Sequence, residues 1–202
     1  MPDYSIEHEI QARGYSLVCG IDEAGRGPLC GPVFAAACIL PDGLIIDGLN
    51  DSKKLTAKKR DALFDVIREN AVAYCIASAS VEEIDELNIR QANLLAMRRA
   101  IDGLSVKPDF AIIDGNDDEG FQIPAIAVVK GDAKSMSISA ASILAKVARD
   151  RICEELDREY PQYGIAKHKG YGTKDHMDAL RKYGPSPIHR KKFIRFLDED
   201  QG

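Results

Sequence analysis

Three short apolar runs of this sequence lead into aspartates, and this feature most limits how the chain can fold. One run ends at Asp22, a second at Asp114, and a lysine and a glycine separate the third from Asp132. Short apolar runs rich in small and β-branched residues predict buried strands. Because strand ends of α/β sheets commonly carry ligand sites, the pattern predicts an α/β domain with acids gathered at the sheet.

The remaining patterns predict helices between and after these strands. Further strands are expected at residues 32–40 and 72–79, and helices at 53–70, 81–104 with a break near Asn88, 137–160 and 174–183. At 202 residues the chain is long enough for one catalytic unit. We expect a two-layer or three-layer α/β domain in residues 1–160 and a small, substrate-facing helical extension in residues 161–202.

Composition places the chain among ordinary globular proteins. It is 45% hydrophobic and 29% charged, and no run approaches the roughly 18 apolar residues of a membrane span. The N-terminal residues are acidic and lack the apolar segment of a signal peptide. The five cysteines are odd in number and show no C-x-x-C spacing, which predicts reduced thiols and a cytoplasmic protein.

The charge of the chain is unevenly distributed. Its formal net charge is −5, yet residues 130–195 hold 15 Lys and Arg against 8 Asp and Glu, which leaves 12 against 24 elsewhere. The C-terminal third is therefore the candidate phosphate-facing surface. A solvated helical face rich in lysine and arginine explains the same local excess equally well.

Four acids are the candidate chemical groups: Asp22, Glu23, Asp114 and Asp132. Taken alone, the first two beside a glycine-rich segment would more often form a turn. All four together would repel one another without a cation, and hard oxygen ligands suit Mg²⁺ or Mn²⁺. Such a site fits two-metal phosphodiester hydrolysis, in which no side-chain nucleophile is required.

Several distinctive motifs follow one another along the chain. They are GIDEAGRGP (20–28), DSKKL (51–55), IDG (113–115), KGDAK (130–134), SAASILAKVARD (139–150), HKGYGTKDH (168–176) and SPIHR (186–190). In this order they resemble the bacterial ribonuclease HII family. The resemblance covers most of the chain. It implies an RNase H-like fold, with a mixed central β-sheet flanked by helices and a small C-terminal helical extension.

The resemblance also implies roles for particular residues. The four acids fall on the family's metal-site carboxylates, and Gly25, Arg26 and Gly27 fall on the backbone segment that recognises the ribonucleotide 2′-hydroxyl. That hydroxyl distinguishes RNA from DNA. Tyr171 matches the tyrosine that packs against the following deoxyribose, although from the residues alone it could equally be a core or hinge aromatic.

The implied reaction is hydrolysis of the RNA strand of RNA–DNA hybrids. It includes cutting 5′ of a single ribonucleotide embedded in duplex DNA, and it leaves a 5′-phosphate and a 3′-hydroxyl. Two rival hypotheses remain: another nuclease of the same fold, such as a resolvase or exonuclease, and a non-catalytic hybrid-binding module. Cleavage of an all-DNA duplex favours the first, and binding without turnover favours the second.

Other polar residues are candidates for substrate contacts near the start of the long helix or in the family motifs. They are Lys53, Lys134, Ser137, Ser139, Ser142 and Lys146. Free amides and hydroxyls at a helix start suit phosphate binding, although each serine is more often a cap or packing residue. Asp150 is a possible supporting acid.

The sequence also predicts what the protein binds. The four histidines lack a partnering cysteine pattern, so a zinc site is not expected. We expect these histidines to lie at the surface or next to a substrate phosphate. The expected partners are RNA–DNA hybrids and ribonucleotide-containing duplex DNA, with no membrane and a monomeric state. A sliding clamp that binds the C-terminal segment has little support.

Overall fold

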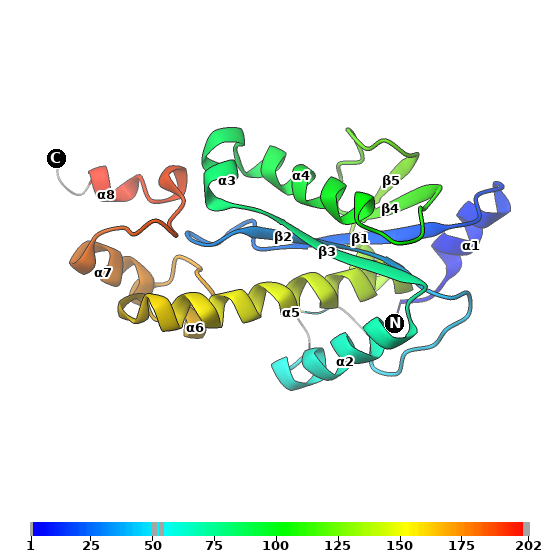
Figure 1. Ribbon diagram of the computed structural model, residues 1–202, viewed down its shortest axis with the longest axis horizontal. Helices are drawn as coiled ribbons and strands as arrows, with labels where there is room; N and C mark the ends of the chain where they lie inside the picture. The colour runs from blue at the N-terminus through cyan, green and yellow to red at the C-terminus, as the bar shows by residue number, and fades with distance from the viewer. Residues whose placement is uncertain (1, 50–51, 53–54, 200–202) are drawn as a thin grey trace.

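The computed structural model describes residues 2–49, 52 and 55–199, and its centre is a mixed five-stranded sheet (Figure 1). The strand order is β3-β2-β1-β4-β5. β2 is antiparallel to both of its neighbours, whereas β1, β4 and β5 are mutually parallel. The strands are β1 (Val18–Ala24), β2 (Val33–Ile39), β3 (Ala73–Ala79), β4 (Phe110–Asp114) and β5 (Ala125–Val128). The predicted strands are confirmed, and the fold is the expected mixed sheet flanked by helices.

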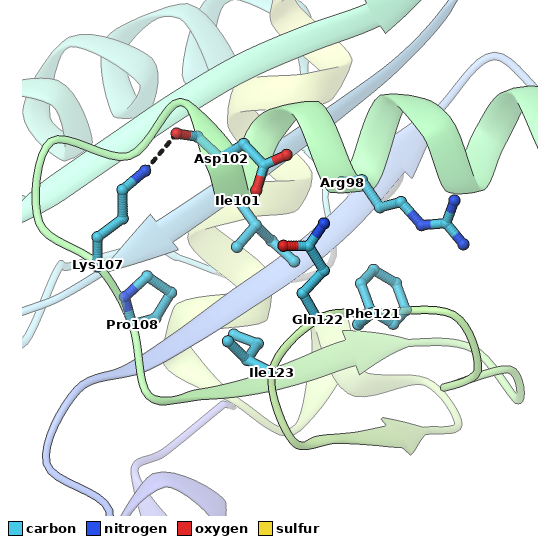
Figure 2. A pocket seen from close by; sticks show the side chains of 8 residues that line it. All are labelled: Arg98, Ile101, Asp102, Lys107, Pro108, Phe121, Gln122 and Ile123. Atoms are coloured by element: carbon cyan, nitrogen blue, oxygen red, sulfur yellow. Dashed lines mark hydrogen bonds between the residues drawn. The ribbon is translucent and has the colours of Figure 1, made fainter.

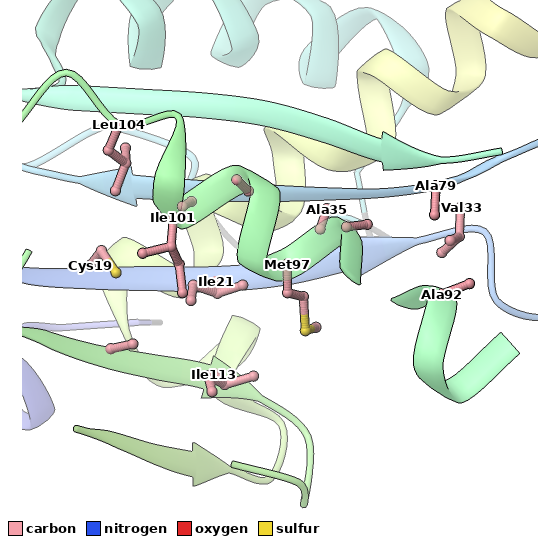
Figure 3. Close-up of a cluster of buried hydrophobic side chains, with 14 of the residues drawn as sticks. Cys19, Ile21, Val33, Ala35, Ala79, Ala92, Met97, Ile101, Leu104 and Ile113 are labelled. Atoms are coloured by element: carbon pink, nitrogen blue, oxygen red, sulfur yellow. The ribbon is translucent and has the colours of Figure 1, made fainter. Parts of the chain in front are cut away.

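One face of the sheet is covered by α3 (Val81–Leu87) and α4 (Ile89–Asp102). Asn88 separates them with a left-handed φ of 75° and accepts hydrogen bonds from the first amides of α4, so the predicted break is confirmed. Figure 3 shows the side chains of β1, β2 and β4 meeting α4. Cys19 and Ile21 of β1 belong to this core.

The other face is covered by α5 (Met136–Glu159) and α2 (Ala57–Asn70), which gives three layers (Figure 1). Gly20 of β1 permits the close approach of α5, because a Cβ there would lie 2.1 Å from the main-chain carbon of Ser137. The expected helix over 53–70 begins at Ala57, where Thr56 caps it, and Lys53 and Lys54 lie outside the described residues.

An N-terminal helix, α1 (Ser5–Ala12), was not predicted. Its Glu7 is buried, and one carboxylate oxygen accepts hydrogen bonds from the Ser135 hydroxyl and the Ser137 amide. Ser135 in turn caps α5 by accepting from the amide of Ile138. The start of the long helix is therefore already occupied by protein groups.

The C-terminal segment packs at one end of the molecule (Figure 1). It contains α6 (Ile165–His168), α7 (Lys174–Tyr183), α8 (Phe196–Glu199) and short 3₁₀ turns at Pro161–Tyr163 and Lys191–Phe193. Tyr163, Ile165 and Leu180 form a small core with Cys30 and with Cys153 of α5. Within the described part of the chain, no helix is long and apolar enough to cross a membrane.

Candidate active site

Asp22 and Glu23 lie on opposite faces of β1, because the strand stays extended through Ala24. Asp22 is 5% exposed and hydrogen-bonds the Ser142 hydroxyl of α5. Glu23 is on the α4 side, where its carboxylate lies 3.4 Å from the Arg26 guanidinium. The adjacent acids therefore flank the strand and do not form a simple turn.

Asp114 ends the neighbouring parallel strand beside Asp22. The register pairs Ile21 of β1 with Ile113 of β4, so the next residue of each strand is an aspartate. Burial raises the pKa of Asp22 well above its usual range, and the charges of Glu23 and Asp114 raise it further. The sheet thus brings three negative groups within electrostatic reach of one another.

Asp132 reaches the same edge through a short 3₁₀ turn, Gly131–Ala133. The Gly131 amide donates to Asp114 at 2.6 Å, which ties the turn to the end of β4. A Cβ at Gly131 would lie 2.6 Å from Ile138 and 3.3 Å from the Asp114 carboxylate, so glycine permits this approach. Asp132 itself is buried.

The donor set of these acids fits a hard divalent cation. Of the residues that the structure describes, no three acids bring their ligand atoms within 4.8 Å of one another. β1 accounts for part of this spacing, because it places Asp22 and Glu23 on opposite faces. Carboxylates gathered at one edge of a sheet repel one another unless a cation lies among them, and carboxylate oxygen is the ligand that Mg²⁺ and Mn²⁺ prefer.

Gly25 and Gly27 allow close contacts on either side of Arg26. Gly25 has a left-handed φ of 99°, and a Cβ there would lie 2.0 Å from Nε of buried Arg149. A Cβ at Gly27 would lie 3.4 Å from the ring of Tyr171, which is 48% exposed. The structure therefore places the predicted loop and the predicted tyrosine side by side.

The positions of Ser137 and Ser139 fit the packing role that was the alternative to a substrate contact. Both are buried, and the amide of Ser137 already donates to Glu7, so neither is open to a substrate. Lys134, by contrast, is exposed. The sequence offered no signal that α1 would supply a carboxylate to the start of α5.

Asp150 and Lys146 are paired with each other at 2.6 Å, and Asp150 also pairs with Arg60 at 3.3 Å. Arg60 donates to the carbonyls of Ser52 and Leu55. Arg60 therefore links Asp150 to Ser52 and Leu55, whereas Lys53 lies outside the described residues. Ser52 also shares a hydrogen bond of 2.9 Å with Ser142, the partner of Asp22.

The predicted surface role is wrong for two histidines. His176 and His189 are buried, and their Nε2 atoms lie 3.1 Å apart. With Cys30 they form a set whose ligand atoms all lie within 4.8 Å, although a hydrogen bond already accounts for the approach of the nitrogens. His8 is exposed and pairs with Asp42.

Several of the basic side chains in residues 130–195 do not contribute to a phosphate-facing surface. Arg149 and Arg190 are buried, and Lys167 and Lys169 pair with acids. Both arginines lie in the family motifs, Arg149 in residues 139–150 and Arg190 in residues 186–190.

Two surface hollows differ in their relation to the acids. One of about 130 Å³ is lined by Glu23, Arg26 and Asp114. Another of about 230 Å³, shown in Figure 2, lies between the end of α4 and the start of β4 and is lined by Ile101 and Phe121. It is at the opposite end of β4 from Asp114, so only the first hollow belongs to the candidate site.

The chain is similar to several known proteins. The family model for Ribonuclease HII matches residues 19–196. Ribonuclease HII 1 of Methylibium petroleiphilum is 60% identical over 184 residues, which are 91% of this chain and 93% of that protein. The crystal structure of ribonuclease H2 from Pyrococcus horikoshii has a TM-score of 0.77 at 29% identity, covering 92% of this chain and 98% of that one. The RNase HII of Archaeoglobus fulgidus, solved in complex with PCNA, has a TM-score of 0.70 at 26% identity, covering 89% and 96%.

Proposed function

Because this chain belongs to the ribonuclease HII family, we propose that it hydrolyses the RNA strand of RNA–DNA hybrids. The proposal includes cutting 5′ of a single ribonucleotide in duplex DNA, which leaves a 5′-phosphate and a 3′-hydroxyl. The observation that carries it is the position of Asp22, Glu23 and Asp114 at the ends of two paired parallel strands, beside the turn that holds Asp132. Excision of ribonucleotides embedded in duplex DNA would be the corresponding repair role.

The four acids would hold Mn²⁺ or Mg²⁺. When bound, the ions would supply an activated water and would stabilise the leaving oxygen. Asp22 is oriented by the Ser142 hydroxyl, and Asp114 by the Gly131 amide, so both carboxylates are held before substrate arrives. Fixed carboxylates lower the cost of reorganisation during the reaction.

The loop at Gly25 to Gly27 would read the ribose, with Tyr171 beside it. A main-chain amide can approach a 2′-hydroxyl closely where no side chain intervenes. The half-exposed ring of Tyr171 offers an apolar face to the next sugar. Lys134 is an exposed cation that could contact a phosphate.

The test is cleavage of an end-labelled DNA duplex that contains one ribonucleotide. A metal-dependent single cut 5′ of the ribonucleotide, lost in EDTA and severely reduced in Asp114→Asn, would support the proposal. An all-DNA duplex of the same sequence is the control. Equal cutting of both duplexes would favour a resolvase-like nuclease, and binding without cutting in either metal would favour a hybrid-binding module.

Further proposals concern the oligomeric state, the compartment and a protein partner. We propose that the protein is cytoplasmic, because all five cysteines are unpaired and four of them are buried. We also propose that it is a monomer. Light scattering after gel filtration tests the monomer. A sliding clamp is less favoured, since Phe196 and Leu197 of the C-terminal segment pack against the protein's own core.

A further inference from the structure

Arg190 is a buried arginine that binds main-chain carbonyls of the loop between β1 and β2. Its side chain is 0% exposed. It donates to the carbonyl oxygens of Gly25 at 2.6 Å, Arg26 at 3.1 Å, Pro28 at 2.8 Å and Gly31 at 2.9 Å. The guanidinium has five N–H donors in a rigid fork, so one side chain can fix several peptide groups at once.

The main chain around Arg190 is also paired with this loop. The Arg190 amide donates to the Leu29 carbonyl at 2.9 Å, and the Gly31 amide donates to the Ile188 carbonyl at 2.8 Å. Cys30 and His189 form an antiparallel bridge between these bonds. The Arg190 side chain is therefore held in place by its own backbone.

A chain of hydrogen bonds continues from this segment to Tyr171. The Ser186 amide donates to Nδ1 of His189 at 3.1 Å, so the proton of His189 is assigned to Nε2. His189 then donates to Nε2 of His176 at 3.1 Å, and Nδ1 of His176 donates to the Tyr171 carbonyl at 3.0 Å. One connected network thus reaches both the loop and the tyrosine beside Gly27.

The carbonyls held by Arg190 determine where the neighbouring amides point. In a planar trans peptide the C=O and the following N–H point in opposite directions. Fixing the carbonyls of Gly25 and Arg26 on the buried side therefore directs the amides of Arg26 and Gly27 the other way. Arg26 and Gly27 are both exposed, so these amides face the side from which a substrate would come.

We infer that Arg190 is a positioning residue for ribose recognition, acting through the peptide groups of Gly25 to Gly27. This inference rests on the proposed function, because that function requires the loop to contact the 2′-hydroxyl. A displacement of about 1 Å in such a contact can lower a rate about 100-fold. The hydrogen bonds of the Arg190 side chain go to main-chain carbonyls of the loop, so we expect metal binding by the acids to be independent of Arg190.

The experiment compares wild type with Arg190→Lys and Arg190→Gln. Lysine keeps the positive charge but loses the planar fork, whereas glutamine loses the charge. The matched control is Arg181→Lys, which changes an arginine of α7 that is about half exposed. Circular dichroism checks folding, and calorimetric titration with Mn²⁺ alone checks the acids.

Two functional measurements then separate positioning from general damage. The first is kcat/KM on the duplex with one ribonucleotide, where we expect a loss of about 10-fold to 100-fold for Arg190→Lys. The second is the ratio of Kd values for that duplex and its all-DNA counterpart, measured in an Asp114→Asn background. We expect the preference for the ribonucleotide to fall about tenfold, with Mn²⁺ affinity unchanged within about twofold.

Each outcome decides the inference. A folded Arg190→Lys protein with wild-type kcat/KM and an unchanged Kd ratio would overturn it. Failure of both variants to fold, or an equal loss of Mn²⁺ binding, would make Arg190 a general determinant of structure and would also overturn it. If the wild type itself does not distinguish the two duplexes, the proposed function fails first, independently of Arg190.

Discussion

Replacing His189 with glutamine should make the protein's stability less sensitive to mild acid. His189 is 3% exposed, and burial, followed by the charge of His176, lowers its pKa to about 4 from the usual 6.5. The folded protein therefore keeps His189 neutral at a pH where the unfolded chain binds a proton. The stability from this group is complete above pH 6.5 and is lost progressively as the pH falls toward 4.

The size of the effect follows from these two pKa values. Linkage gives a loss of about 2 kcal/mol in the free energy of unfolding at pH 5, and nearly none at pH 7.5. The pKa of His176 is also lowered, mainly by burial, so it adds a loss of the same sign. A typical domain is stable by 5–15 kcal/mol, roughly, so the effect is large enough to measure.

Urea unfolding at pH 7.5, 6.5, 5.5 and 5.0 measures the effect. His189→Gln should lower stability at every pH because it removes native hydrogen bonds. Between pH 7.5 and 5.0, however, the free energy of unfolding of the variant should fall by about 2 kcal/mol less than that of wild type. Ile45→Gln, at an exposed position whose side chain does not titrate, is the control and should follow the wild-type slope. Parallel slopes for wild type and His189→Gln would refute the reasoning.

Three further predictions concern the loop, the helix start and the metal site. Gly25→Ala should lower the free energy of unfolding by about 1–2 kcal/mol because of the left-handed φ alone, and by more because the new Cβ would meet Arg149. Thermal unfolding measures this loss, and an unchanged Tm would contradict the prediction. Glu7→Gln should lower the free energy of unfolding by about 1–2 kcal/mol, because it weakens the capping of α5. Urea unfolding measures this loss, and no loss would show that the buried carboxylate is dispensable. Mn²⁺ should raise the Tm of wild type but not of Asp114→Asn, and equal Tm shifts in both proteins would argue against the site. Because the pKa of Asp22 is raised, Mn²⁺ binding should weaken as the pH falls.

The sequence predicted the elements of this fold well because their signals are local. Apolar runs marked the five strands, and the break at Asn88 agreed with the side chain that caps α4. α1 was missed because its eight residues include only two large apolar side chains, Ile6 and Ile10. Its importance comes from one long-range contact, between Glu7 and the start of α5, which no local pattern can show.

The candidate site was less predictable at the level of single side chains. Parallel pairing of β1 and β4 makes Asp22 and Asp114 neighbours, and the positions of both at strand ends suggested this. The burial of Ser137 and Ser139 could not be inferred, because a serine near a helix start can face either solvent or a strand. Arg190 looks like one more basic residue in a basic segment, and only the tertiary fold shows that it is buried.

The contact between Arg190 and Gly25 joins residues 165 positions apart in the chain. Contacts of such long sequence separation form late, because the intervening chain must first be closed into a loop. Synthesis adds a further order in time, since the N-terminal half emerges and begins to fold before residue 190 has been made. A nascent chain could therefore assemble the sheet and its acids while the loop still lacks its arginine, so the two parts of the site would mature at different times.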